Sequence, residues 1–589
     1  MNLSSTIKSI QDIMRKDDGV DGDAQRIGQL TWLMFLKIFD QREEEWADDA
    51  EDKGLKYQSP MPENCRWRSW AKYVGGSDGK LAPQMSSSEI IKHVNEVVFP
   101  GLKSLTTEHD KDESFIAKAK VVREVFVDSN NYMKSGTLLL EVIEKLDGAI
   151  NFHDLKTRAN LGDLYEQLLN DLRAAGNAGE FYTPRGVTQF MVEQVNPQLH
   201  ESVLDPACGT GGFLTASIQH LSHQLTDDSS AEDKKSIEKS IRAFEKKQLP
   251  HLLCTTNMLL HGIDVPSQIE HMNTLGKPWN DWNKNDKVDC LITNPPFGGT
   301  EEDGVGTDYP SDVRTRETAD MFLTLIVRKL MKDGARGAIV LPDGSLFGDG
   351  VKNKIKENLL KECNLHTIIR LPSGVFSPYT SIKSNLLFFT KGQPTETIWY
   401  YEHPYPEGYK SYNKTKPIRV EEFEAEREWW GNEENGFADR VSNQFAWKVD
   451  FEAKKLAAEI KAKPFWEQAE KLKAEASEIN NQIKDLKSSI KGIKESGKRV
   501  LVDKEIEALR LKMSEIKLQE KHAKETGDGI YWPIYDLDID NPHVEEVIIH
   551  DPDELLSTYK SQQKDITALR EQLKSTLAHA LSNDAGSNQ

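Results

Sequence analysis

The 589-residue sequence has no apolar run that approaches the ~20 residues needed for a membrane-spanning helix. Its first residues also lack the apolar block and small-residue cleavage site of a secretory signal. Only five cysteines occur, an odd number without a CxxC pair, which argues against a disulfide framework. No Cys/His group has the spacing of zinc ligands, so we expect no metal site. These absences predict a cytoplasmic protein that is not embedded in a membrane.

Positive charge is also scarce relative to negative charge. The chain has 75 Lys and Arg residues against 95 Asp and Glu residues, which gives a formal net charge of −20 at pH 7. A protein that binds nucleic acid alone usually carries a basic face, because phosphate contacts supply most of the non-specific affinity. The acidic total does not forbid a local basic groove, but it favours a partner that supplies much of any grip on nucleic acid.

Three regions differ in their apolar pattern, and together they predict an α/β protein with helical flanks. Residues 1–150 carry apolar residues at helical spacing, for example over 27–39, and predict a helical N-terminal domain. Residues 151–395 alternate short apolar runs with amphipathic stretches, which predicts a mostly parallel sheet covered by helices on both faces. Residues 396–589 are expected to form a C-terminal extension.

This extension shows heptad-like spacing on both sides of Ser496-Gly497. The spacing predicts two long helices joined by a turn and packed as a coiled-coil hairpin, with a last helix over 553–581. We expect the hairpin to contact another subunit, and packing against its own domain is the alternative. The apolar residues at heptad-like steps are Leu472, Ile479, Ile483, Leu486, Ile490, Ile493, Ile506, Leu509, Met513 and Ile516.

A glycine-rich turn follows one of the predicted strands. Residues 204–213 read LDPACGTGGF, and the glycines let the backbone turn tightly beside a ligand. The pattern is not the phosphate loop GxxxxGK[ST], because no lysine follows the glycines. We therefore expect a nucleoside ligand with an amino-acid tail, whose ammonium group would pair with Asp205. A turn that serves packing alone is the alternative.

A second motif ends another predicted strand, where residues 289–297 read DCLITNPPF. Two prolines after Asn294 stiffen the backbone and remove two N–H donors, which leaves carbonyl oxygens as acceptors beside the Asn294 amide oxygen. Two acceptors would hold the amino hydrogens of adenine N6 and direct its lone pair towards an electrophilic methyl group. Phe297 offers a stacking face for a base turned out of the duplex. A Pro-Pro loop with an ordinary Asn cap is the alternative.

The two motifs in this order resemble the amino methyltransferases that methylate adenine N6. The chain is similar in particular to the modification subunit of type I restriction-modification systems, over about residues 161–391. Residues 179–185, GEFYTPR, resemble that family's cofactor-binding stretch. The resemblance implies a Rossmann-like methyltransferase domain that uses S-adenosylmethionine and acts on the N6 amino group of adenine in DNA.

The resemblance also assigns roles to matching positions. It implies that Asn294, Pro295, Pro296 and Phe297 are the catalytic residues. A carboxylate at the position of Glu245 can accept both ribose hydroxyl protons, although a helix-start charge is the alternative. The residues that would bind the cofactor are Glu180, Phe181, Tyr182, Thr183, Pro184, Arg185, Asp205, Gly209, Thr210, Gly211, Gly212 and Glu245.

One position departs from the family pattern. Related proteins often carry an Asp ahead of Thr/Ser-Leu after the third strand, whereas this chain has Asn273-Thr274-Leu275. An Asn can still hydrogen-bond the cofactor adenine, so that contact stays open. The polar, Gly-rich stretch 298–320 is long for a connection, and it predicts either an element that closes over DNA or a surface loop.

Other acceptors compete with adenine in DNA. Cytosine C5 methylation needs a Cys nucleophile after the Asn-Pro position, but Cys290 lies earlier, within a predicted strand. Cytosine N4 methylation usually has Ser before the prolines. Adenine in RNA and the side chain of a protein glutamine remain alternatives, although the glutamine enzymes typically have Tyr in place of Phe297. A scaffold without activity is a third class, and the intact motif argues against it.

The resemblance finally implies partners. A specificity subunit would read the DNA sequence, with two modification subunits per specificity subunit, and a restriction subunit that uses ATP would join the full complex. The expected function is therefore adenine-specific methylation of DNA within a type I restriction-modification complex.

Overall fold

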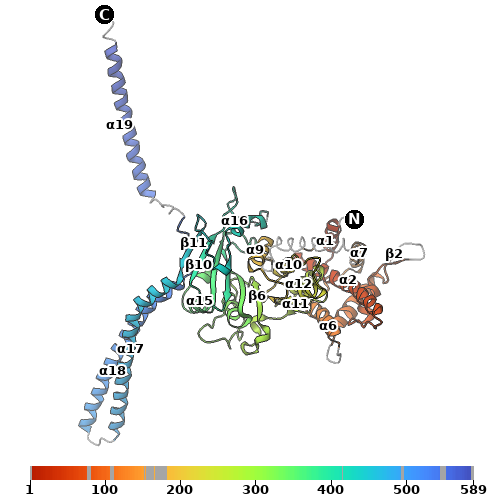
Figure 1. Ribbon diagram of the computed structural model, residues 1–589, viewed down its shortest axis with the longest axis horizontal. Coiled ribbons are helices and arrows are strands. Elements are labelled where there is room, and N and C mark those ends of the chain that lie inside the picture. The colour runs from red at the N-terminus through yellow and green to blue at the C-terminus, as the bar shows by residue number, and fades with distance from the viewer. Residues whose placement is uncertain are drawn as a thin grey trace. The chain divides into compact units, whose positions relative to one another are not determined.

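The computed structural model describes residues 3–75, 81–106, 112–151, 153, 165, 182–413, 415–491, 496–543 and 552–584 (Figure 1). Contacts divide the chain into two units, Met1–Asp540 and Asn541–Gln589. Among the described residues, no helix has both the length and the apolar character needed to cross a membrane.

Helices dominate the described part of the first 150 residues, as the apolar spacing predicts. The face of α2 that points inward carries Trp32, which packs edge-on against Phe99 with ring centroids 5.1 Å apart. Lys37, also on α2, is 3% exposed and pairs with Asp147 at 2.6 Å, the kind of partner that a buried charge requires. The elements are α1 (Leu3–Met14), α2 (Gly22–Asp52), α3 (Trp67–Trp70), β1 (Val74–Gly75), β2 (Leu81–Ala82), α4 (Ser87–His93), α5 (Phe99–Lys103), α6 (Glu113–Phe126) and α7 (Gly136–Ala149).

A nine-stranded sheet forms the core of the next region, in the order β11-β10-β8-β9-β7-β6-β3-β4-β5. The strands from β5 to β7 in this order pair in parallel, and β9 lies antiparallel between β7 and β8. The strands are β3 (Val203–Asp205), β4 (Ile241–Glu245), β5 (Ile269–His271), β6 (Val288–Thr293), β7 (Met331–Pro342), β8 (Cys363–Leu371), β9 (Ser384–Lys391), β10 (Thr397–Glu402) and β11 (Ala446–Asp450).

Helices alternate with these strands, as predicted. From β3 the chain adds β4 and β5 towards one edge of the sheet, and from β6 it adds β7 in the opposite direction. The strand order therefore reverses between β3 and β6, and open α/β sheets bind ligands outside the carboxyl ends at such a point. The helices are α9 (Arg185–Val195), α10 (Gly212–Ser222), α11 (Ala231–Ser240), α12 (Gln248–Leu260), α13 (Thr318–Leu325), α14 (Asp343–Leu346), α15 (Val351–Glu362) and α16 (Glu424–Trp429).

The sheet continues past residue 395, where the sequence pattern places the end of the methyltransferase domain. β10 pairs in parallel with β8, and β11 pairs antiparallel with β10. Trp447 of β11 stacks on Tyr400 of β10 with ring centroids 5.3 Å apart. The structural domain thus extends beyond the predicted boundary, because two later strands complete the same sheet.

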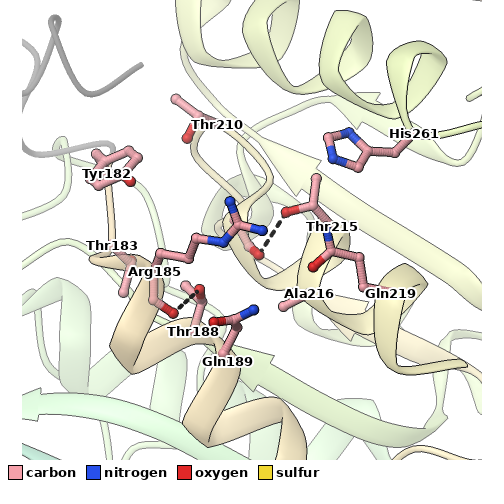
Figure 2. Close-up of a pocket in the computed structure, with 11 residues that line it drawn as sticks. Tyr182, Thr183, Arg185, Thr188, Gln189, Thr210, Thr215, Ala216, Gln219 and His261 are labelled. Carbon is pink, nitrogen blue, oxygen red and sulfur yellow. Dashed lines mark hydrogen bonds between the residues drawn. The ribbon is translucent and has the colours of Figure 1, made fainter. Parts of the chain in front are cut away.

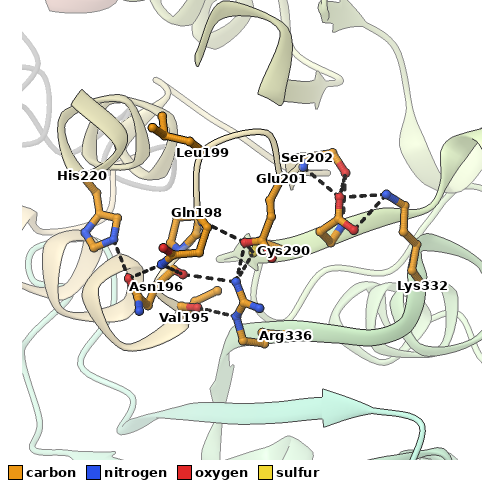
Figure 3. Close-up of polar contacts among 12 residues, drawn as sticks. Val195, Asn196, Gln198, Leu199, Glu201, Ser202, His220, Cys290, Lys332 and Arg336 are labelled. Carbon is orange, nitrogen blue, oxygen red and sulfur yellow. Dashed lines mark hydrogen bonds and ion pairs between the residues drawn. The ribbon is translucent and has the colours of Figure 1, made fainter. Parts of the chain in front are cut away.

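A polar network holds the start of β3 to its neighbours at the edge of the sheet opposite the switch point (Figure 3). Arg336 of β7 forms an ion pair with Glu201, two residues before β3. Asp289 of β6 accepts a hydrogen bond from the Ser202 backbone N–H at 2.9 Å and pairs with Lys332 of β7 at 2.8 Å. These contacts fix β3 beside β6 and so position the turn that follows β3.

The predicted helical hairpin consists of α17 (Phe451–Ile490) and α18 (Ser496–Tyr531), which run side by side (Figure 1). Residues at the heptad-like steps, among them Ile479, Ile483 and Ile506, form its buried seam. At its base, Phe451 and Tyr531 join the apolar core beneath the sheet. The two helices of the hairpin therefore bury these apolar residues against each other.

The second unit contains the predicted last helix, α19 (Pro552–Asp584). Its apolar side chains are exposed within this unit, including those of Leu556, Ile566, Leu569, Leu573 and Leu577.

Candidate functional site

A cavity of about 330 Å³ lies at the switch point, beside the carboxyl ends of β3, β4 and β6. Its volume falls within the roughly 300–1,000 Å³ typical of small-molecule sites. The structure brings the glycine-rich turn and the Asn-Pro-Pro-Phe segment together in this one cavity. The predicted site residues that line it are Thr183, Asp205, Gly209, Gly212, Glu245, Asn294, Pro296 and Phe297.

Asp205 is the last residue of β3 and is 1% exposed. Its Oδ1 accepts hydrogen bonds from the Ala207 backbone N–H at 3.1 Å and from the Thr293 hydroxyl at 2.7 Å. The pKa of the Asp205 carboxyl is raised from 3.8 to about 7, mainly by burial and also by the negative charge of Glu245, while its hydrogen bonds from Thr293 and Ala207 oppose the rise. The side chain therefore changes charge near neutral pH and presents a strong acceptor for a cation.

Glu245 ends β4 and faces the same cavity. Its Oε2 accepts from the Gly209 backbone N–H at 2.9 Å, and its Oε1 accepts from the Lys247 backbone N–H at 2.7 Å. Gly209 has a φ of +53°, which glycine adopts without strain. Burial raises the pKa of the Glu245 carboxyl, while the backbone hydrogen bonds oppose that rise. The backbone hydrogen bonds thereby fix the orientation of the carboxylate at the cavity.

Asn294 follows β6 directly, and its side chain has one satisfied end and one free end. Its Nδ2 donates a hydrogen bond to the Thr183 hydroxyl oxygen at 3.0 Å. Its Oδ1 is buried and has no hydrogen-bond partner among the described residues. A buried acceptor without a partner is costly, so this oxygen is suited to a donor supplied by a ligand.

Phe297 is half-buried at the rim of the cavity. Its ring packs edge-on against Phe376, with centroids 5.8 Å apart. This contact holds the ring in place, and its remaining surface is available for a planar ligand.

A second, smaller pocket of about 20 Å³ adjoins the first, and the two share Thr183 and Gly212 (Figure 2). Tyr182, Arg185 and Thr210 line it, so these three predicted residues lie here and not in the larger cavity. Figure 2 shows the Arg185 guanidinium extending towards Thr210 and Thr215. Within the described residues no carboxylate pairs with it, so the pocket offers an anion one unpaired cation.

Some predicted residues lie elsewhere. Gly211 does not line the cavity, because a Cβ there would point at the Cys254 sulfur of α12, 2.8 Å away, and not into ligand space. Pro184 immediately precedes α9 and is buried, and Pro295 is buried beside the cavity without lining it. Glu180 and Phe181 lie outside the described residues.

Sequence reasoning missed several residues that line the cavity. Phe213 is the last residue of the glycine-rich motif and Lys246 follows Glu245, so the proximity of both to the site could have been inferred from the spacing. Glu301 and Thr318 come from the polar stretch 298–320, and Tyr379 comes from a loop before β9, where no pattern marks them.

Two expectations concern alternative chemistry. No group of three or more His, Cys, Asp or Glu residues that could hold a metal occurs in the part of the chain that the structure describes. Cys290 is buried within β6, and burial raises the pKa of its thiol to about 12. Because this thiol is buried in the sheet, is un-ionised near neutral pH and does not line the cavity, it is not placed to act as the nucleophile of cytosine C5 methylation.

A sheet with this strand order and a glycine-rich turn at its switch point defines the Rossmann-like methyltransferase class. Residues 156–470 match the N-6 DNA Methylase family, and residues 3–146 match the HsdM N-terminal domain. The chain therefore belongs to the N-6 DNA methylase family and is a methylase subunit of the type I restriction-modification class. Its activity is the adenine-specific methylation of DNA.

Individual relatives agree with this assignment. The chain is 48% identical to the type I restriction enzyme EcoEI methylase subunit of Escherichia coli, over 100% of both chains. It is 42% identical, with a TM-score of 0.62, to a chain assigned as a modification subunit of a type I restriction enzyme from Vibrio vulnificus YJ016, covering 76% of this chain and 92% of that one. It is 29% identical, with a TM-score of 0.67, to a chain from a structure of the assembly of a type I R-M system, covering 98% of each.

Proposed function

We propose that the switch-point cavity binds S-adenosylmethionine and that Asn294 holds the amino group of the target adenine beside it. The observation that carries this proposal is the buried, unpartnered Oδ1 of Asn294 at a cavity that also contains Asp205 and Glu245. When bound, the cofactor supplies an electrophilic methyl group on a sulfonium. The donor set fits it, because its ribose offers two hydroxyl donors and its amino-acid tail offers an ammonium and a carboxylate.

The chain's carboxylates would orient the cofactor. Backbone N–H groups hold both oxygens of Glu245 in place, and the carboxylate keeps acceptor capacity for the ribose hydroxyls. Asp205 would receive the ammonium group. The tail's carboxylate would pass Thr183 into the smaller pocket, where Arg185 has no carboxylate partner within the described residues (Figure 2).

The target amine would be held by two acceptors. Asn294 Oδ1 would accept one amino hydrogen, and the backbone carbonyl of Pro295, which lies beside the cavity, would accept the other. This geometry withdraws the nitrogen lone pair from the ring and directs it towards the methyl donor. Phe297 stacks on the base. Both acceptors are neutral, and the proton leaves after methyl transfer, so no strong base is required.

The experiment that tests this function is methyl transfer from labelled S-adenosylmethionine by Asn294→Ala. DNA, RNA and protein acceptors are assayed side by side, with the specificity subunit present. A hydrogen bond to a group that becomes charged contributes about 1.5–3 kcal/mol, so we expect a roughly 10–150-fold lower kcat on DNA. Cofactor affinity should change little. The exposed Asn285→Ala is the matched control. If Asn294→Ala kept the kcat of the unchanged protein, the proposed role of Asn294 would be wrong. If methyl groups were transferred only to RNA or to glutamine, DNA would not be the substrate.

The same proposal extends to partners. The net charge of −20 and the exposed apolar side chains of α19 support a chain that works with a specificity subunit, two modification subunits to one specificity subunit. A restriction subunit would complete the assembly. We expect the purified chain alone to methylate DNA weakly and the co-purified complex to methylate it fully. Full activity of the chain alone would contradict this.

A further inference from the structure

Glu301 is a buried carboxylate in the cavity that none of the motifs marks. It lies in the loop after Phe297, is 8% exposed and lines the switch-point cavity. Its backbone is anchored twice to Arg316, whose carbonyl oxygen accepts from the Glu301 N–H at 3.0 Å and whose guanidinium donates to the Glu301 carbonyl oxygen at 2.8 Å. The neighbouring Thr300 and Glu317 form a β-bridge. The loop thus holds this one carboxylate in the cavity.

The two oxygens of Glu301 differ in their contacts. Oε2 receives the Lys246 ammonium at 3.0 Å and the Asn273 amide N–H at 3.3 Å. Oε1 has no hydrogen-bond partner among the described residues. Lys246 follows Glu245 in the chain, so Glu301 lies next to the carboxylate proposed to hold the ribose. An acceptor is therefore open on the side of the cavity where the purine attached to that ribose would lie.

Asn273 does not line the cavity, and both ends of its side-chain amide are engaged. Its Oδ1 accepts the Leu275 backbone N–H at 3.2 Å as the cap of a short helical turn, and its Nδ2 donates to Glu301. This is the position where related proteins often carry an Asp. In this chain the Asn273 amide instead donates a hydrogen bond to Glu301, a carboxylate from another loop.

We infer that Glu301 accepts the hydrogen bond from the 6-amino group of the cofactor's adenine, and that Lys246 and Asn273 position it to do so. The inference rests on the proposed cofactor site. A carboxylate is acceptor-only, so it favours a purine with an amino group at position 6. It disfavours hypoxanthine, whose 6-oxo group is itself an acceptor. Glu301 is then a specificity residue for the cofactor and takes no part in methyl transfer.

The test compares binding of S-adenosylhomocysteine with binding of S-inosylhomocysteine, measured by calorimetry on the full chain. One charge-assisted hydrogen bond predicts a roughly 10–100-fold preference for the adenosyl ligand in the unchanged protein. Glu301→Gln should reduce this preference at least ~10-fold, because a glutamine amide can donate to the 6-oxo group. The adjacent exposed Glu302→Gln should keep the original preference.

The preference ratio separates recognition from structural support. If Glu301 only braced Lys246 and Asn273, Glu301→Gln would weaken both ligands equally and leave the ratio unchanged, which would overturn the inference. Equal affinity of the unchanged protein for both ligands would overturn it without any variant, even if Glu301→Gln did not fold. If the unchanged protein bound neither ligand, the proposed cofactor site itself would fail, and this inference with it.

Discussion

Asp205→Asn is the substitution whose effect can be worked out most fully from the structure. Both hydrogen bonds to Asp205, from Ala207 N–H and the Thr293 hydroxyl, end on Oδ1. An asparagine keeps that oxygen and replaces only Oδ2, so the turn after β3 should retain its geometry. The substitution removes a titratable carboxyl group, and burial raises the pKa of that group from 3.8 to about 7.

The sign of the pH dependence follows from this shift. The folded protein holds the Asp205 proton more tightly than the unfolded chain, so folding stability falls as pH rises from about 4 to about 7. A shift of about three pH units at about 1.36 kcal/mol per unit corresponds to about 4 kcal/mol as the upper limit. Without cofactor, Asp205→Asn should therefore gain up to about 4 kcal/mol of stability relative to the unchanged protein between pH 4 and pH 8.

Urea unfolding of both proteins at several values between pH 4.5 and pH 8 measures this difference, with the exposed Asp281→Asn as control. Cofactor binding should show the opposite trend, because the ligand's ammonium pairs with the ionised carboxylate. With a pKa of about 7, the ionised fraction rises roughly tenfold from pH 6 to pH 8, and affinity for S-adenosylhomocysteine should rise with it. Parallel stability curves for the two proteins, together with pH-independent affinity, would refute the argument.

Three further substitutions test other parts of the structure. Phe297→Ala should lower kcat/KM for DNA in steady-state methylation, because about 1–3 kcal/mol of stacking on the base is lost. Phe297→Tyr keeps an aromatic ring and should stay near the unchanged values. Gly211→Ala places a Cβ 2.8 Å from the Cys254 sulfur at a φ of +85° and should cost about 2–4 kcal/mol in urea unfolding; adding Cys254→Ala should recover part of this loss, and no recovery would contradict the assigned clash. Lys37→Met leaves Asp147 without its cation and should lower unfolding stability by about 3 kcal/mol, whereas an unchanged urea midpoint would contradict a structural role for this pair.

The sequence predicts the general fold and the main site because both depend on local patterns. Apolar runs of strand length, separated by helical stretches, indicate a parallel sheet, and the two motifs follow such runs directly. Since the carboxyl ends of parallel strands share one edge, the meeting of Asp205 and Asn294 follows from pattern alone. The extension of the sheet does not. β10 and β11 are separated by a long segment of loops and short helices that gives no strand-pairing signal, so the predicted boundary falls short of them.

The sequence pattern does not predict which way an individual residue points. Gly211 and Gly212 are adjacent in one motif, yet only Gly212 lines the cavity, because Gly211 packs its backbone against Cys254 of α12. Glu301 lies in a polar stretch where one acidic residue resembles the next. Its role emerges only when Lys246 and Asn273 are seen to converge on the same oxygen.

Thr183 connects the two halves of the site. It lines both the larger cavity and the smaller pocket, and its hydroxyl oxygen accepts the Asn294 amide N–H. An amide whose nitrogen is held in this way must turn its oxygen the other way, and that oxygen is the one proposed to receive the adenine amine. Thr183, in the segment before α9, thus also orients Asn294 in addition to lining the proposed cofactor site. Because the same residue borders the cofactor's proposed position and orients the acceptor for the base, a change that displaces Thr183 should weaken both functions together, whereas a change at Phe297 should weaken base recognition alone.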